Sequence, residues 1–234
     1  MSYEIQVSAR ARRVTLHILA GRGLVVTVPR RFPKRDIPAI VEENRAWVLE
    51  SLAQLRARTP AKYLVWPPAR LDLNAMNTRV FLDYCHPDGS DSAVVDSTEA
   101  SRWVLAVDTE NRPLVAQALA SVLKYVARDV LLPLLRELAV RHGLTYQRAS
   151  IRGQRTLWGS YSSTGTLSLN YKLLFLQAEL VEYVLLHELA HTRYLDHSAK
   201  FWRLLVELLP DAVALDRRLR DAGDDVPPWL ELAR

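Results

Sequence analysis

His187–His197 has the sequence HELAHTRYLDH, and this stretch decides how the rest of the chain is interpreted. His187 and His191 are four residues apart, so on a helix their imidazoles lie on one face and can bind a single metal ion. Glu188 lies next to His187, where its carboxylate can reach a water molecule on that ion. His197 follows six residues after His191, and it offers a further imidazole. The pattern is typical of a hydrolytic zinc site.

A catalytic zinc ion takes three protein ligands and leaves one position open for water. We predict that one zinc ion is bound by His187, His191 and His197. Glu207 in the following helix is the alternative third ligand, as in a thermolysin-like arrangement, and ranks second. A purely structural zinc site would need more cysteines than the single Cys85. Without a metal, the two helical histidines would be ordinary core residues, which we consider the weaker interpretation.

The spacing of the histidines resembles that of metzincins, but two features exclude this class. Tyr194 stands where the metzincin pattern has a glycine. The only methionines are Met1 and Met76, so no methionine turn can follow the zinc-binding stretch. The site therefore belongs to another type of zincin.

The composition is that of an ordinary globular protein, with 49% hydrophobic and 24% charged residues among 234. No apolar run is long enough to cross a membrane, and the first residues do not resemble a secretory signal. One cysteine allows no intrachain disulfide. We expect a cytoplasmic protein with no membrane partner.

The pattern of apolar residues predicts an α+β fold. Residues 3–29 alternate between apolar and polar and predict an antiparallel hairpin or meander. Asp36 is expected to cap a helix that continues to about Arg58. Strand-like pieces follow at Tyr63–Trp66, Arg79–Tyr84 and Trp103–Val107, with turn-forming residues at 86–90.

A long helix is predicted next, from about Pro113 to His142, and Pro133 should kink or break it. We therefore predict an N-terminal antiparallel β-rich unit with one helix over residues 1–110. A zincin-like catalytic domain would cover residues 111–234, with a β-hairpin, the HExxH helix and following helices. One integrated domain is the alternative.

The predicted hairpin combines Gln154–Tyr161 with Thr166–Asn170 and precedes the HExxH helix. In zincins such an edge can pair with an extended substrate, although another part of the chain could equally cover it. We expect substrate contacts from this region. The candidates are Arg155, Trp158, Gly159, Ser168 and Asn170.

Basic residues are concentrated at the start of the chain, where only Glu4 and Asp36 oppose them in the first 36 residues. Such a cluster could attract nucleic acid, nucleotide phosphates or an acidic protein surface. No known nucleic-acid motif accompanies it, so a solvated strand face is the more conservative interpretation. The cluster consists of Arg10, Arg12, Arg13, Arg22, Arg30, Arg31, Lys34 and Arg35.

Four stretches together resemble the YgjP-type family of metal-dependent hydrolases, with the WLM and SprT-like metalloproteases as more distant relatives. They read RTLWGS at 155–160, LSLNY at 167–171, EYVLLHELAH at 182–191 and DHSAKFW at 196–202. The resemblance implies a zincin-like fold, the three histidines as zinc ligands and Glu188 as general base. Tyr161 departs from the family, which often has cysteine at this position.

A peptidase is the leading functional hypothesis. Zinc would activate a water molecule, Glu188 would accept its proton, and a polypeptide would be cleaved. Tyr194 is the first candidate for stabilising the oxyanion, and an aromatic side chain that only closes the turn is an equal alternative. Arg155 and Tyr171 are weaker candidates.

Two other functions remain open. The resemblance also admits a nucleoside-triphosphate (UTP) pyrophosphatase, whose phosphates would need cations. Against this alternative, pyrophosphate cleavage more often uses magnesium held by carboxylates. The third hypothesis is a non-catalytic, nucleic-acid-associated zinc module that binds through the basic N-terminal hairpin. The candidate cations for a nucleotide substrate are Arg152, Arg155, Lys172, Arg193 and Lys200.

Overall fold

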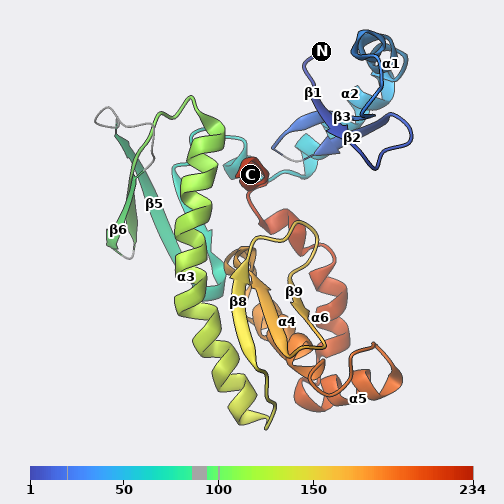
Figure 1. The fold of residues 1–234 in the computed structure, drawn as a ribbon. Coiled ribbons are helices and arrows are strands. Elements are labelled where there is room, and N and C mark those ends of the chain that lie inside the picture. The colour runs from blue at the N-terminus through green and yellow to red at the C-terminus, as the bar shows by residue number, and fades with distance from the viewer. Residues whose placement is uncertain (20, 86–93, 100, 234) are drawn as a thin grey trace.

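The computed structural model describes residues 1–19, 21–85, 94–99 and 101–233. Helices and three small sheets alternate along the chain (Figure 1), which confirms the predicted α+β class. The first sheet belongs to an N-terminal unit, and the other two lie on either side of one long helix.

The first sheet has the order β1-β3-β2. Its strands are β1 (Glu4–Ser8), β2 (Thr15–Leu19) and β3 (Gly23–Pro29). β2 pairs antiparallel with β3 as predicted, but β1 runs parallel to β3, so the expectation of a wholly antiparallel unit is wrong. β3 is rich in apolar residues, and its Leu24–Val26 is fully buried, so this strand takes the central position of the sheet. β1 and β2 therefore pair with opposite edges of β3 and not with each other.

Two helices cover this sheet instead of the single predicted helix. They are α1 (Ile37–Glu43) and α2 (Arg45–Arg58), and they are separated at Asn44. The Asn44 side chain donates a hydrogen bond to the carbonyl oxygen of Ile40 over 2.8 Å, which competes with the regular helical pattern. Asp36 occupies the N-cap position of α1 as predicted, but its backbone is helical in conformation and its side chain makes no capping hydrogen bond.

The second sheet has the order β4-β5-β7-β6, with β5 and β7 parallel. Its strands are β4 (Arg70–Leu73), β5 (Thr78–Cys85), β6 (Val94–Glu99) and β7 (Arg102–Ala106). The predicted strands at 79–84 and 103–107 are confirmed, whereas Tyr63–Trp66 forms no strand. The turn predicted at 86–90 lies outside the described residues.

Helix α3 (Arg112–Arg141) lies between the second and third sheets (Figure 1). The helix continues through Pro133, so of the predicted kink or break, the break does not occur. Leu131 and Leu135 on either side of Pro133 are fully buried, whereas Pro133 faces solvent, where water can satisfy the carbonyl group that loses its partner. Among the described helices, α3 included, none is long and apolar enough to span a membrane.

The third sheet has β10 at its centre, between β8 and β9. The strands are β8 (Arg148–Arg152), β9 (Gly159–Tyr161) and β10 (Thr166–Asn170). β9 and β10 form the predicted hairpin, although its first strand begins at Gly159 and not at Gln154 as predicted. Gly165 in the turn has a φ of 77°, which favours glycine. The chain continues through three helices, α4 (Ala178–Ala190), α5 (Ala199–Leu208) and α6 (Ala212–Leu219).

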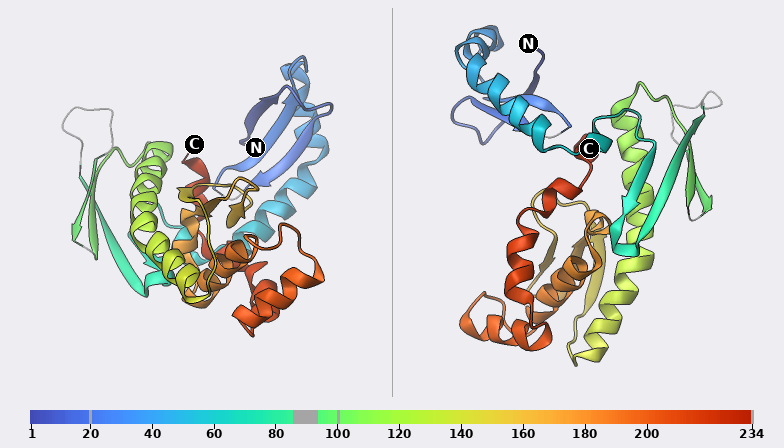
Figure 2. Two further views of the ribbon diagram at one scale, coloured as in Figure 1. Left: turned by 60° about the horizontal axis from the view of Figure 1, so that its bottom comes forward. Right: turned by 180° about the vertical axis from the view of Figure 1, so that it is seen from behind.

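Two separate hydrophobic cores are present. The smaller core lies within residues 24–48, between the first sheet and α1 and α2. The larger core extends from Leu71 to Leu230 and includes the second sheet together with the HExxH region. The division into two domains at residue 110 stays a prediction. The cores lead us to propose a division within residues 59–70 instead (Figure 2).

Candidate metal centre

The three histidines of the HExxH region converge on one point. His187 is in the last turn of α4, His191 ends that helix, and His197 precedes α5. Each offers one ring nitrogen to a group whose atoms all lie within 4.8 Å of one another. The Nε2 atoms of His187 and His197 are only 3.0 Å apart. Helix α4 and the loop that follows it therefore build a three-nitrogen cluster.

A chain of hydrogen bonds orients His187. Its Nδ1 lies 3.3 Å from the hydroxyl group of Tyr183, one turn earlier on α4, and this hydroxyl donates to Oδ1 of Asp216 over 2.9 Å. Burial, together with this carboxylate, raises the pKa of Tyr183, so the phenol keeps its proton. Because Tyr183 donates to Asp216, Nδ1 of His187 is the donor to Tyr183, and Nε2 is left free for a metal.

His191 is oriented by the loop that follows it. Its Nδ1 lies 2.9 Å from the backbone carbonyl oxygen of Tyr194, which can only accept a hydrogen bond. The proton is therefore on Nδ1, and Nε2 is again free. Tyr194 thus contributes to the site through its backbone.

Phe201 packs against all three imidazole rings from α5. Its ring centroid is 5.0 Å from that of His187, 4.6 Å from that of His191 and 4.8 Å from that of His197. The side chain is fully buried. Phe201 therefore restricts the rotation of the three rings by contact and excludes water from one side of the cluster.

The donor set fits the single zinc ion that the sequence predicts. Two nitrogens that bind one zinc tetrahedrally at about 2.0–2.1 Å lie roughly 3.3 Å apart, close to the observed separation of 3.0 Å between His187 and His197. Burial lowers the pKa of His187 to about 4, so this ring is neutral near pH 7, as a metal ligand must be. Glu207, the alternative ligand, is exposed and does not belong to the cluster.

Glu188 is a buried carboxyl group beside the cluster. The residue is 6% exposed, and its Oε2 atom has no hydrogen-bond partner among the described residues. Burial raises its pKa to about 8. An unpartnered buried carboxyl group is costly to the fold, and such groups concentrate at functional sites. Glu188 is thus the main candidate for proton transfer.

Gly159 of β9 leaves the space that Glu188 occupies. A Cβ atom at position 159 would lie 2.7 Å from both Cγ and Oε1 of Glu188, which is closer than such atoms approach. The hairpin and α4 therefore meet directly at the general-base candidate. Any larger residue at 159 would displace the carboxyl group.

An open cleft of about 370 Å³ gives access to the cluster. The hairpin supplies one wall with residues 156–161, and α4, His197 and α6 supply the rest. Among the described residues that line this cleft, none is lysine or arginine, and two, Glu188 and Asp216, are acidic. Leu157 and Leu195, 52% and 64% exposed, lie at the cleft and offer apolar surface.

The predicted substrate residues divide into two groups. Trp158 and Gly159 line the cleft, whereas Arg155, Ser168 and Asn170 do not. Ser168 faces Ser150 of β8, with 3.4 Å between their hydroxyl oxygens. Asn170 is buried and donates to the carbonyl oxygens of residues 154 and 157, each over 2.8 Å. Asn170 thus holds the cleft wall in place from behind.

Four contributors to the site were not predicted for these roles: Tyr183, Asp216, Phe201 and Tyr161. Tyr183 lies four residues before His187, a spacing that could have suggested a contact on the same helical face. Asp216 and Phe201 come from later helices, and no local pattern connects them with the histidines. Both Tyr161 and the predicted Tyr194 pack against the main core, but only Tyr161 lines the cleft.

Residues 12–222 match the protein family described as "YgjP-like, metallopeptidase domain". The chain belongs to the YgjP-like family. This confirms the resemblance drawn from the four sequence stretches. Membership in the YgjP-like family identifies a metal-dependent, peptidase-like hydrolase, to which the three-histidine cluster offers a metal site.

Two solved structures are similar to parts of this YgjP-like chain. The metallopeptidase zymogen abylysin of Pyrococcus abyssi is 28% identical, with 38% of this chain and 90% of that chain covered and a TM-score of 0.35. The metallopeptidase zymogen jannalysin of Methanocaldococcus jannaschii is 21% identical, with 40% and 96% covered and a TM-score of 0.36. No curated protein matches the chain.

Proposed function

We propose that this YgjP-like protein is a zinc-dependent peptidase with a zincin-like arrangement. The observation that carries the proposal is the buried, unpartnered Glu188 beside three converging histidines in an open cleft without described cations. His187, His191 and His197 would hold the ion. A polypeptide is the proposed substrate, because a neutral amide needs no cation in the cleft.

Zinc, when bound, would polarise the scissile carbonyl group and lower the pKa of a water molecule. Glu188 is placed to accept a proton from water and to pass it to the leaving nitrogen. Its burial matters here, because a carboxyl group whose pKa is raised toward neutrality can both accept and return a proton near pH 7. Gly159 holds open the space in which this transfer would occur.

Tyr161 replaces Tyr194 as our leading candidate for a donor to the developing oxyanion. Of the two tyrosines that line the described cleft, Tyr183 is already committed to Asp216. This leaves the hydroxyl group of Tyr161 for the substrate. Tyr194 does not line the described cleft.

The outer edge of β9 offers a binding site for an extended peptide. β9 is an edge strand, and its Gly159 contacts Glu188, so a peptide added to this edge would pass beside the metal centre. A second cavity of about 490 Å³ adjoins the cleft and shares Thr156, Leu157, Trp158 and Leu219 with it. We infer that this cavity receives a side chain of the substrate, with Leu157 as the dividing residue.

The pyrophosphatase alternative has less support. Lys172, one of its candidate cations, is buried and pairs with Glu231 over 2.6 Å. Arg193 donates to the carbonyl oxygen of Gly143, and Arg152 and Lys200 are not among the residues that line the cleft or the adjoining cavity. Arg58, Arg155 and Arg220 also line the adjoining cavity. Arg220 pairs with Asp216 over 3.0 Å, so Arg58 and Arg155 would have to serve the phosphates. The non-catalytic alternative does not account for the buried carboxyl group of Glu188.

One comparison tests the proposal. Purified wild type and Glu188→Gln are assayed for bound metal, for cleavage of an unfolded protein such as casein, and for hydrolysis of nucleoside triphosphates. Glu207→Gln is the matched control, because Glu207 is an exposed glutamate outside the cluster. We expect peptide cleavage by wild type and Glu207→Gln only, with metal retained in all three. Triphosphate hydrolysis that depends on Glu188 would instead support the pyrophosphatase function. Inactivity of the wild type on both substrates would support the non-catalytic module.

A further inference from the structure

The two loops that carry most of the N-terminal positive charge meet at one end of the first sheet. β1 and β3 are parallel, and Ser8 at the end of β1 pairs with Pro29 at the end of β3. The chain therefore leaves both strands at the same end, into residues 9–14 and residues 30–36. We call these two segments the basic end. An antiparallel pairing of β1 and β3 would have placed them at opposite ends.

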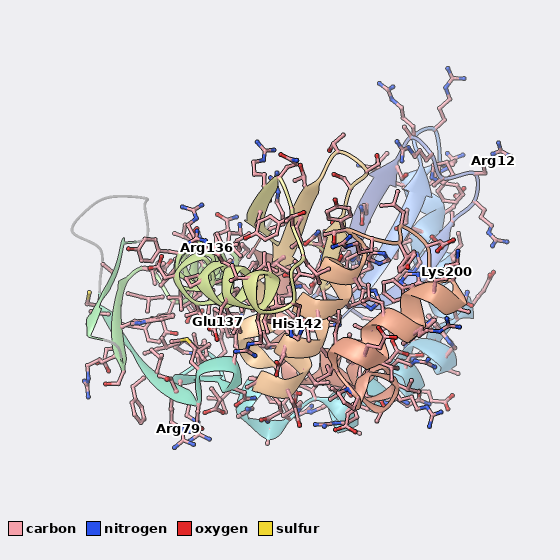
Figure 3. The ribbon with its side chains drawn as sticks, turned by 90° about the horizontal axis from the view of Figure 1, so that it is seen from below. Arg12, Arg79, Arg136, Glu137, His142 and Lys200 are labelled. Atoms are coloured by element: carbon pink, nitrogen blue, oxygen red, sulfur yellow. The ribbon has the colours of Figure 1, made fainter. Side chains whose placement is uncertain are left out.

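The basic end concentrates cations that the fold does not neutralise. All seven are exposed, and in the described part of the chain only Arg35 has an acidic group within ion-pair distance, Asp36 at 3.7 Å. Figure 3 shows that Arg12 extends from the protein into solvent. None of the residues that line the metal cleft comes from these segments. The seven are Arg10, Arg12, Arg13, Arg30, Arg31, Lys34 and Arg35.

We propose that the basic end binds the phosphate backbone of double-stranded nucleic acid without reading its sequence. Six of the seven cations are arginines, whose planar guanidinium groups match phosphate oxygens in a bidentate manner. Two neighbouring loops with several such groups can contact successive phosphates. Phe32, the aromatic residue of these segments, is half-buried against the N-terminal core, so no base-stacking platform is offered to a single strand.

The salt dependence of binding follows from this proposal. Each neutralised phosphate contributes about −0.9 to the slope of log affinity against log salt concentration. Four contacts would therefore lower the affinity roughly 150-fold between 50 and 200 mM salt. Loss of these contacts should both weaken binding and flatten this dependence.

The experiment uses fluorescence anisotropy with the full chain and a labelled duplex DNA of about 20 base pairs of arbitrary sequence. The test variant combines Arg12→Glu, Arg13→Glu, Arg30→Glu and Arg31→Glu. The control combines Arg128→Glu, Arg136→Glu, Arg148→Glu and Arg217→Glu, four exposed arginines elsewhere that change the net charge equally. Arg136 on α3 is far from Arg12 in Figure 3.

We expect the test variant to lose binding by about 100-fold or more at 50 mM salt, and the control to lose much less. Unfolding curves establish whether each variant is folded. If the test variant is not folded, a variant with Arg→Gln at the same four positions replaces it. Equal losses in both variants, or salt-independent binding by the wild type, would overturn the proposal. Tighter binding to polyglutamate or to phosphatidylserine vesicles than to the duplex would also overturn it, in favour of an acidic protein surface or a membrane.

Discussion

The metal centre and the basic end use charged and polar groups in opposite ways. At the metal centre, the imidazoles of His187 and His191 are oriented by the hydrogen bonds that they donate to the Tyr183 hydroxyl group and to the Tyr194 carbonyl group, and Phe201 packs against all three rings. At the basic end, exposed cations extend into solvent almost without acidic partners. The first region depends on the position of each atom, and the second depends on the sum of its charges. Substitutions should therefore act steeply and individually at the centre, and weakly and additively at the basic end.

The largest effect is expected from His197→Ala. It removes one of three ligands and should reduce bound zinc to less than about a tenth of the wild-type content after dialysis. Elemental analysis of the purified protein measures this. Glu207→Ala should keep its metal. Full zinc content in His197→Ala would contradict the ligand assignment and leave the cluster without its third member.

Glu188→Gln should keep the metal and lose activity. The amide has nearly the same shape but cannot accept a proton, so kcat for peptide cleavage should fall by about 10²–10⁴-fold. Steady-state kinetics on a labelled peptide, with metal content measured in parallel, separates the two effects. Activity within a few-fold of wild type would remove Glu188 from its proposed role.

Gly159→Ala should act through Glu188. The added methyl group would lie 2.7 Å from the glutamate side chain and must displace it, and a displacement of about 1 Å can cost about 100-fold in rate. We expect a lower kcat with unchanged metal content. Ser121→Ala is the control, because Ser121 is exposed on α3 and lines neither the cleft nor the adjoining cavity. Unaltered turnover in Gly159→Ala would show that the carboxyl group has room to move.

Asp216→Asn tests the hydrogen-bond chain behind His187. The amide is a weaker acceptor for Tyr183 and no longer carries a charge, so zinc affinity should fall by roughly 10–100-fold. Competition with a chromogenic chelator measures this affinity. Asp211→Asn, an exposed position before the same helix, should leave it unchanged. Equal affinities of Asp216→Asn and wild type would limit Asp216 to a structural role.

The smallest effect is expected from a single change at the basic end. Arg12→Ala removes an exposed, unpaired side chain and should alter the free energy of unfolding by less than about 0.5 kcal/mol. Phe201→Ala, at the metal centre, should lower it by about 3–5 kcal/mol. Urea denaturation of both variants provides the comparison. A large loss in Arg12→Ala would mean that the basic end contributes to the fold.

Some of these features could be predicted from the sequence because they depend on neighbours along the chain. The spacing of His187 and His191 places both rings on one helical face, and alternation with a turn glycine predicts the hairpin of β9 and β10. The same local logic does not predict that the helix continues through Pro133, where burial of the flanking leucines outweighs one lost hydrogen bond. It also failed at Asn44, whose side chain competes for a backbone carbonyl group.

The sequence by itself determined the metal-binding motif, the α+β class and the family, since each follows from residue types at fixed spacings. Only the tertiary structure decided which residues support the motif. The metal centre also receives contacts from distant elements, and no local sequence pattern predicts them. These contacts come from Asp216 of α6, Phe201 of α5 and Gly159 of β9. The tertiary structure also decided that the two basic segments lie at the same end of the sheet. The parallel pairing of β1 with β3 that brings them together depends on the burial of β3 between distant parts of the chain. Contacts of this kind arise from packing between distant elements, and the residue periodicity within one element does not predict them.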